Sequence, residues 1–203
     1  MKSFLKTHNK DLKDVAVPLV VGMFVFVFWF VLYPQYLSYQ EQCQLFLWTG
    51  DYFVQSMQVA GGLVQYFGEF IVQFYAIEWL GALLLTLVFV ALQVLTYALL
   101  PKKNKWVSST LSILPVVLLI YMMGDENVML AFPLSVISAM GMSLLMRKVS
   151  LYWDVIVIPC LYWLIGPMVW FYVILRLVWC RKWIYSVAFL FVAAVQLLAY
   201  NTV

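Results

Sequence analysis

The chain has 203 residues, of which 66% are apolar and 10% are charged, and its mean hydropathy is +0.97. Soluble domains carry about 25% charged and about 45–50% apolar residues, so this composition excludes an ordinary water-soluble domain and makes lipid the main solvent. The net charge of +3 comes from basic residues scattered in short loops, which excludes nucleic-acid binding because no continuous basic stripe exists.

The N-terminal segment predicts a first membrane span. Residues 1–14 form a polar tail with four lysines, and the apolar run Val15–Tyr33 follows it. A helix of about 19 residues crosses a hydrocarbon core of about 30 Å, because each residue adds about 1.5 Å. A signal peptide would have a shorter apolar core and a small-residue cleavage site. We therefore expect an uncleaved first helix.

Residues 34–78 predict an outer segment of interfacial helices. Apolar residues recur at helical spacing over 63–74, and Gln65, Glu69 and Gln73 share the opposite face. Such a helix is too polar to span, so we expect it to lie flat at the outer interface or to pack over the mouth of the bundle.

Glycines divide this outer segment. Residues 36–48 are rich in glutamine and aromatic residues and are expected to be helical. Gly50 and the pair Gly61–Gly62 predict helix breaks. Asp51 would then lie at a turn near the membrane surface.

The remaining chain predicts further spans separated by short polar turns. Pro101–Lys105 and Arg147–Lys148 are basic turns, and Gly124–Asn127 is an acidic one. The predicted spans are Trp79–Leu100, Trp106–Met123, Val128–Met146, 151–165, 168–179 and Ile184–Tyr200.

The stretch Leu151–Trp179 is longer than an ordinary membrane-spanning helix, and Gly166–Pro167 interrupts it. We interpret it as a hairpin of two short helices. One long tilted helix kinked at Pro167 is the alternative.

The distribution of charge predicts the topology. With seven spans and a cytoplasmic N-terminus, all twelve Lys and Arg residues fall at the cytoplasmic face, and the outer loops hold only carboxylates. The sequence thus predicts an all-α membrane bundle of about seven transmembrane helices, a single domain over 1–203, with an interfacial helical cap. The C-terminus would be periplasmic.

The outer segment also holds the candidate site. In one interpretation a carboxylate is a general base, and nearby aromatic and amide groups bind a neutral sugar or polyol. In the other, the segment is an interfacial cap whose acids face water or occupy turns. The candidate catalytic residues are Asp51, Glu41 and Glu69, and the candidate binding residues are Gln65, Gln73, Tyr52 and Trp48.

Nothing predicts a metal site or identifies a cofactor. Cys43, Cys160 and Cys180 have neither metal-binding nor redox spacing, and the one histidine is His8 in the polar tail. Small apolar packing roles suit the cysteines.

Asp154 and Arg176 are charged residues inside predicted spans, one turn from the cytoplasmic face. Burying a charge in a membrane is costly unless it is paired. A structural pair between them, independent extension of both side chains to the interface, and a transport role are the three interpretations.

The stretches YPQYLSYQEQCQLFLWTGDYF (33–53) and GGLVQYFGEFIVQFY (61–75) resemble the N-terminal part of an uncharacterised family of Bacteroidetes inner-membrane proteins. The resemblance covers roughly the first 80 residues. Members of that family are longer, so it implies a short or truncated member here. The architecture is also similar to GT-C type lipid-linked glycosyltransferases, whose early loop carboxylate would correspond to Asp51. The outer loops lack the Arg or Lys that would hold a donor phosphate.

The leading functional hypothesis is a bacterial inner-membrane protein of unknown activity that handles cell-envelope glycan or lipid-linked sugar precursors at the periplasmic face. Its expected partners are the bilayer, a polyprenyl-linked or lipid substrate, and a protein docked on the outer segment. A non-enzymatic subunit or scaffold and a small transporter are the alternatives.

Overall fold

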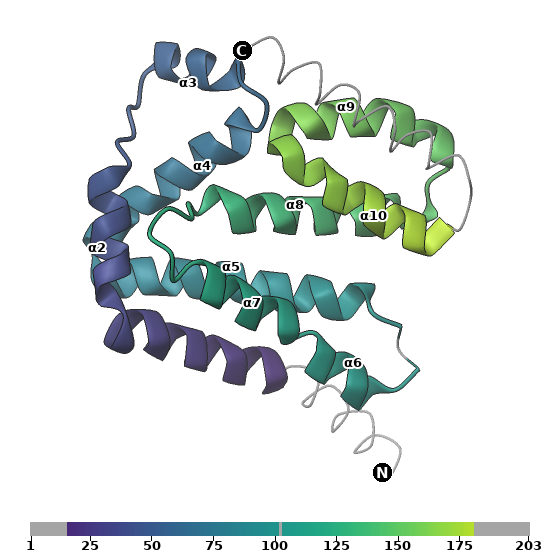
Figure 1. The fold of residues 1–203 in the computed structure, drawn as a ribbon, viewed down its shortest axis with the longest axis horizontal. Coiled ribbons are helices and arrows are strands. Elements are labelled where there is room, and N and C mark those ends of the chain that lie inside the picture. The colour runs from purple at the N-terminus through teal and green to yellow at the C-terminus, as the bar shows by residue number, and fades with distance from the viewer. Residues whose placement is uncertain (1–15, 102, 181–203) are drawn as a thin grey trace, which may run out of the picture. The chain divides into compact units, whose positions relative to one another are not determined.

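The computed structural model describes residues 16–101 and 103–180. The basic tail 1–14 and the predicted span Ile184–Tyr200 lie outside this range. Within it the chain forms helices and no strands, as the sequence predicts. After the first helical segment, Ala16–Leu32, the helices are α2 Pro34–Cys43, α3 Gly50–Met57, α4 Gly62–Val72, α5 Glu78–Leu99, α6 Lys105–Leu111, α7 Leu114–Met122, α8 Ala131–Leu145, α9 Asp154–Ile165 and α10 Val169–Cys180 (Figure 1).

The chain divides into two compact units. The first unit comprises Met1–Leu45 and Phe70–Met129, and the second comprises Phe46–Glu69 and Leu130–Val203. The expectation of a single domain stays a prediction. Each unit is described separately.

The first unit is organised around α5, whose Leu85, Phe89 and Leu92 are fully buried. The first helical segment packs against it at Gly22, where an added Cβ would lie 3.1 Å from a methyl group of Val90. This close approach favours a residue without a side chain, because a larger one would displace the Val90 methyl group by a few tenths of an ångström.

A bend of 75° separates the first helical segment from α2. Pro34 is the first residue of α2, where proline is favoured because its missing N–H needs no partner. The α2 helix is tied to the turn after α7: Tyr36 donates to the carbonyl of Val128 at 2.9 Å, and Gln40 donates to that of Glu126 at 2.6 Å.

The outer segment is helical as predicted, with one difference. The helix predicted over 36–48 ends at Cys43, and extended backbone follows at Gln44. Gly61 has a φ of +85°, which glycine adopts without strain, so the predicted break at Gly61–Gly62 is confirmed.

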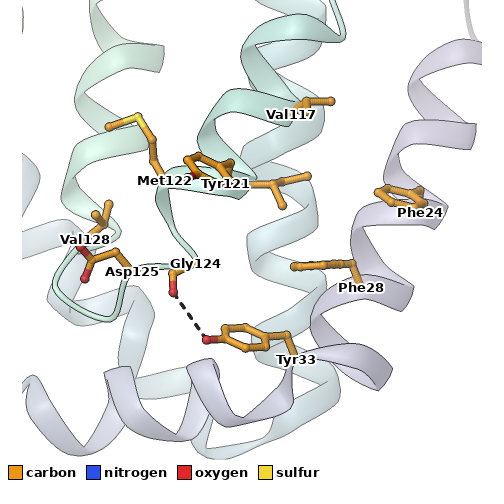
Figure 2. A pocket seen from close by; sticks show the side chains of 10 residues that line it. Phe24, Phe28, Tyr33, Val117, Tyr121, Met122, Gly124, Asp125 and Val128 are labelled. Atoms are coloured by element: carbon orange, nitrogen blue, oxygen red, sulfur yellow. Dashed lines mark hydrogen bonds between the residues drawn. The ribbon is translucent and has the colours of Figure 1, made fainter.

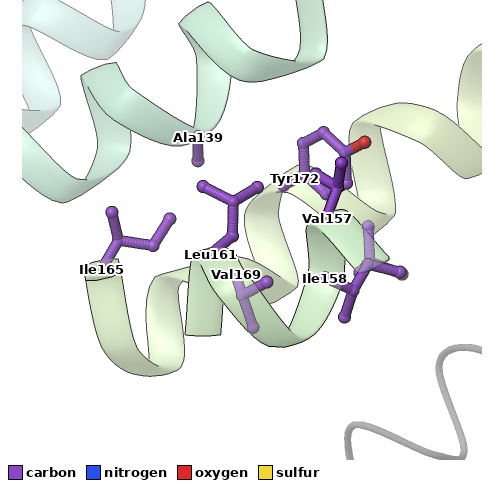
Figure 3. Packing of buried hydrophobic residues seen from close by; sticks show 8 residues of the cluster. Ala139, Val157, Ile158, Leu161, Ile165, Val169 and Tyr172 are labelled. Carbon is purple, nitrogen blue, oxygen red and sulfur yellow. The ribbon is translucent and has the colours of Figure 1, made fainter. Parts of the chain in front are cut away.

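The core of the second unit lies between α8, α9 and α10. Figure 3 shows Leu161 and Ile165 of α9, Val169 and Tyr172 of α10, and Ala139 of α8 gathered into one buried cluster. The apolar face of each helix is thereby buried against the other two helices.

The predicted hairpin at Gly166–Pro167 is confirmed. Gly166 has φ +65° and ψ −144°, a conformation that ends α9, and α10 runs back beside α9 (Figure 1). Arg176 forms an ion pair with Asp154, 22 residues earlier, and a straight helix would hold two such residues about 33 Å apart. The alternative of one kinked helix is therefore wrong.

The predicted count of seven spans is not supported. Among the described residues, Glu78–Leu99, Lys105–Met122 and Asp154–Val178 are long and apolar enough to cross a membrane, and the bent pair of Ala16–Leu32 and α2 adds a fourth candidate. The hairpin folds Asp154–Val178 in half. The α8 helix, of 15 residues, is about 22 Å long, and the 12-residue α9 and α10 are about 18 Å each, all shorter than a hydrocarbon core of about 30 Å. Hydropathy alone did not reveal these lengths.

Candidate functional site

Glu69 is the best-supported carboxylate of the candidate site, and it belongs to the second unit. It lies on α4, where Gln65 one turn earlier donates to its Oε1 at 3.0 Å. Residues four apart share a helix face, which brings this pair together. Tyr52 of α3 donates its hydroxyl hydrogen to Oε2 of Glu69. The carboxylate is therefore oriented by two neutral donors from two helices, and it remains partly exposed.

Tyr52, which donates to this carboxylate, belongs to a group of packed aromatic rings. The ring of Tyr66 lies 4.9 Å from that of Phe46, 5.1 Å from that of Phe53 and 6.0 Å from that of Tyr52 between centroids. The rings of Phe46 and Phe53 meet Tyr66 edge to face, an arrangement that is favourable for aromatic pairs, and Tyr52 is tilted against it. Trp48 continues the group, 6.0 Å from Phe46, and is 79% exposed. We call Phe46, Trp48, Tyr52, Phe53 and Tyr66 the aromatic cluster.

The local sequence explains how α3 presents Tyr52. Thr49 precedes α3, and its Oγ1 accepts a hydrogen bond from the backbone N–H of Tyr52 at 3.3 Å, an N-terminal cap. Burial, and then the hydrogen bond to Glu69, raise the pKa of Tyr52 to about 12. Tyr52 is therefore a neutral hydrogen-bond donor at physiological pH.

Asp51 occupies a different environment from Glu69. It is exposed and lies in the first turn of α3, where the helix dipole favours a carboxylate. This position matches the interpretation of Asp51 as a helix-terminus residue. A catalytic role for Asp51 stays a prediction.

Glu41 and Gln73, also named from the sequence, belong to the first unit. Glu41 is partly buried on α2. Gln73 donates to the backbone carbonyl of Gln44 at 2.9 Å, and Gln44 donates in turn to the side chain of Gln40. The second unit thus brings Tyr52, Gln65 and Glu69 together without these two residues.

A second charged cluster lies within the helical hairpin. Nη2 and Nε of Arg176 donate to Oδ2 of Asp154 at 2.8 and 3.1 Å, and the hydroxyl of Tyr172 donates to Oδ1 at 2.6 Å. Nη1 of Arg176 donates to the carbonyl of Met146 at 2.5 Å. The two charged side chains are only 3% and 4% exposed. Buried charges persist when they are paired and hydrogen-bonded, and both conditions hold here.

The described part of the chain contains no group of three or more His, Cys, Asp or Glu side chains placed to hold a metal ion.

Comparison with known proteins assigns the chain to a family. The model of DUF6057, a family of unknown function, matches residues 10–203. The chain belongs to the DUF6057 family. The match covers residues 10–203 and gives no support to a Bacteroidetes origin or to a similarity with GT-C type glycosyltransferases. No curated protein and no solved structure matches the chain.

Two partners in this DUF6057 protein were not anticipated from sequence. Tyr172 and the Met146 carbonyl complete the Asp154–Arg176 cluster, and only the register of the hairpin reveals them. The hydrogen bond from Tyr52 to Glu69 joins two named residues across the turn at Gly61. The amphipathic pattern of α4 predicted that Glu69 and Gln65 share a helix face. It gave no indication that Tyr52 of α3 contacts Glu69.

Proposed function

We propose that this DUF6057 protein is an integral protein of a bacterial inner membrane that binds the sugar or polyol part of a lipid-linked envelope precursor on the periplasmic side. The binding site is Glu69 with the aromatic cluster. The observation that carries the proposal is the Glu69 carboxylate, oriented by Tyr52 and Gln65 beside rings that a ligand can reach.

The apolar surface of the helices supports membrane insertion. Met23 of the first helical segment is 72% exposed, Leu87 of α5 is 56% exposed and Val155 of α9 is 74% exposed. Large apolar areas of this kind need lipid or protein to cover them. Helices satisfy their own backbone hydrogen bonds, which a hydrocarbon core demands.

The distribution of charge supports the proposed orientation. Lys103 and Lys105 follow α5, whereas Asp125 and Glu126 follow α7, and positive loops favour the cytoplasm. Under this orientation α2, α3 and α4 lie at the periplasmic face. Reporter fusions within 102–105 and within 124–127 test it: the two sites should report opposite sides, and the same side for both would contradict the orientation.

The chemistry of the site favours a neutral group over a phosphate. No Lys or Arg occurs between Val15 and Pro101, so this stretch contributes no cation to bind an anion. Sugar hydroxyls can donate to a carboxylate while the apolar face of the ring packs on aromatic side chains. Phe46 and Tyr66 provide such faces against Tyr52, which donates to Glu69.

Binding measurements on the detergent-solubilised full chain test the proposal, with a short-chain polyprenyl phosphate compared with the same lipid carrying a hexose. Glu69→Gln should weaken binding of the hexose-bearing lipid about tenfold or more, because a hydrogen bond to a charged group contributes about 1.5–3 kcal/mol. Binding of the phosphate alone should not change. Glu78→Gln, which neutralises an exposed acid at the start of α5, is the matched control.

Equal affinity of the unaltered protein for the two lipids would contradict the proposed sugar site. Asp51→Asn separates this site from the one implied by the resemblance to lipid-linked glycosyltransferases. We expect Asp51→Asn to leave hexose-lipid binding unchanged. A loss of binding as large as that of Glu69→Gln would move the site to Asp51.

A further inference from the structure

An apolar groove opens in the first unit, between the first helical segment and α7. Its volume is about 950 Å³. Figure 2 shows Phe24 and Phe28 on one wall, Val117 and Tyr121 on the other, Tyr33 and Gly124 at one end, and Asp125 next to Gly124 on the side of Val128. Neither the proposed sugar site nor the hairpin uses any of these residues.

The dimensions of the groove suit one acyl chain. Phe24 and Tyr33 are nine residues apart, which in an α-helix corresponds to about 14 Å, and the π-helical turn Phe28–Leu32 between them makes this an upper limit, close to half of a hydrocarbon core of about 30 Å. Its wall residues are open to the surroundings: Phe24 is 61% exposed, Val117 is 56% exposed and Tyr121 is 84% exposed. The groove therefore has the depth of a single membrane leaflet and an apolar lining.

The end of the groove is polar and acidic. Tyr33 donates to the carbonyl of Gly124 at 3.5 Å. The backbone N–H and the side-chain amide of Asn127 donate to Oδ1 of Asp125 at 3.0 and 2.8 Å, and these hydrogen bonds lower the pKa of Asp125. Asp125 is therefore ionised at neutral pH.

Nothing in the nearby sequence compensates this charge. No Lys or Arg occurs in 15–101 or in 106–146, which together include every lining residue of the groove. An exposed carboxylate attracts a positively charged ligand group. The groove thus pairs an apolar floor with a mouth that favours a cation.

We propose that this groove binds one acyl chain of a phospholipid with a primary-amine headgroup, such as phosphatidylethanolamine, whose ammonium group lies at Asp125. The inference rests on the membrane insertion in the proposed function and is independent of the sugar site. An anionic lipid such as phosphatidylglycerol lacks the ammonium group and would place its charge beside a carboxylate.

Native mass spectrometry of the full chain, released from nanodiscs of equal phosphatidylethanolamine and phosphatidylglycerol with identical acyl chains, tests the proposal. We expect bound phosphatidylethanolamine to exceed phosphatidylglycerol about three- to fivefold, the range of an exposed ion pair of up to about 1 kcal/mol. Asp125→Asn should abolish the preference and retain some bound lipid. Glu78→Gln, the control for charge, should retain the preference.

A second variant tests the apolar part of the groove. Val117→Trp places an indole in the groove and should reduce the occupancy of both lipids at least threefold. Val155→Trp adds the same indole at an exposed position of α9 and should not reduce it. Unchanged helical circular dichroism in both variants shows that the fold is retained.

Three results would overturn the proposal. One is equal retention of the two lipids by the unaltered protein, and another is full lipid occupancy in Val117→Trp. The third is a lipid-free dimer that Val117→Trp dissociates, since a second copy would then fill the groove. Glu69→Gln should leave lipid occupancy unchanged, so failure of the sugar site and failure of the groove are distinguishable.

Discussion

The two carboxylates Asp154 and Glu69, both in the second unit, are stabilised in different ways. Asp154 is buried and paired with the guanidinium of Arg176, and Tyr172 also donates to it. Glu69 is partly exposed and is oriented by Tyr52 and Gln65, which carry no charge. A buried carboxylate with a cation is suited to hold a fold together, whereas an accessible one among neutral donors and rings is suited to bind a ligand. Loss of charge should therefore affect stability at Asp154 and binding at Glu69.

Removal of the Arg176 cation should have the largest effect on the unfolding free energy. Arg176→Met leaves Asp154 buried without its counter-charge, which should cost about 3–5 kcal/mol of unfolding free energy. Unfolding of the purified protein by SDS measures this. Lys148→Met, at an exposed lysine, is the control and should change little.

The double variant Asp154→Leu/Arg176→Met sharpens the same comparison. Replacing both charges by apolar groups removes the uncompensated carboxylate, so it should recover much of the stability lost in Arg176→Met. If the double variant is no more stable than Arg176→Met, the pair does more than compensate buried charge.

The turn of the hairpin should show the next largest effect. Gly166→Ala forces a side chain into a left-handed backbone conformation and places a Cβ 3.3 Å from the carbonyl oxygen of Ala60, at a cost of about 1–3 kcal/mol. Gly141→Ala is a matched control in α8, because a Cβ there meets nothing within 4 Å. Gly141→Ala should leave the unfolding free energy unchanged or raise it slightly. Equal unfolding free energies for the two variants would contradict the strained turn.

Glu69→Gln should have a small effect on stability, about 1 kcal/mol or less, because its hydrogen bonds are partly exposed and glutamine can still accept one from Tyr52. The same SDS unfolding measures it beside Arg176→Met. A loss as large as that of Arg176→Met would make Glu69 a structural residue and remove the contrast with Asp154.

The smallest effect is a shift in tyrosine titration. The pKa of Tyr52 is raised to about 12 from an ordinary value of about 10, so the neutral hydroxyl is favoured in the folded state. The neutral Tyr52 hydroxyl therefore contributes fully to the stability of the fold below about pH 10, and this contribution is lost as the pH rises through about 12. The tyrosinate absorbance of the wild type minus that of Tyr52→Phe should show this late titration, and a difference centred near pH 10 would contradict it.

The sequence predicted local features better than lengths and long-range contacts. Gly166–Pro167 predicted the hairpin because a helix rarely continues through that pair, and the four-residue spacing placed Gln65 beside Glu69. The partners of Asp154 other than Arg176 depend on hairpin register, which no local pattern encodes. The groove at Phe28 depends on how two distant helices pack.

The described residues do not support seven spans, and the reason is physical. Hydropathy reports that α8, α9 and α10 are apolar, and it does not report where a helix stops. The short 3₁₀ turns at Met146–Lys148, Leu151–Trp153 and Gly166–Met168 shorten these helices. Each turn has a polar residue, glycine or proline in or beside it, but such residues also occur within longer helices.

The contacts of α4 have a consequence for the surrounding lipid. The backbone of Gly61 lies against that of Gly166 at the tip of the hairpin, and Gly68 lies against Ala131 at the start of α8. Arg176 lies 10 residues after Gly166 on α10, and Arg147 lies 16 residues after Ala131, just beyond α8, and these separations correspond to about 15 and 24 Å along a helix. Under the proposed membrane insertion, a hydrocarbon core of about 30 Å is deeper than this, and the lipid headgroups beside the second unit would dip inward. A membrane-bound ligand would then meet Glu69 below the average plane of the outer surface, already partly drawn out of water.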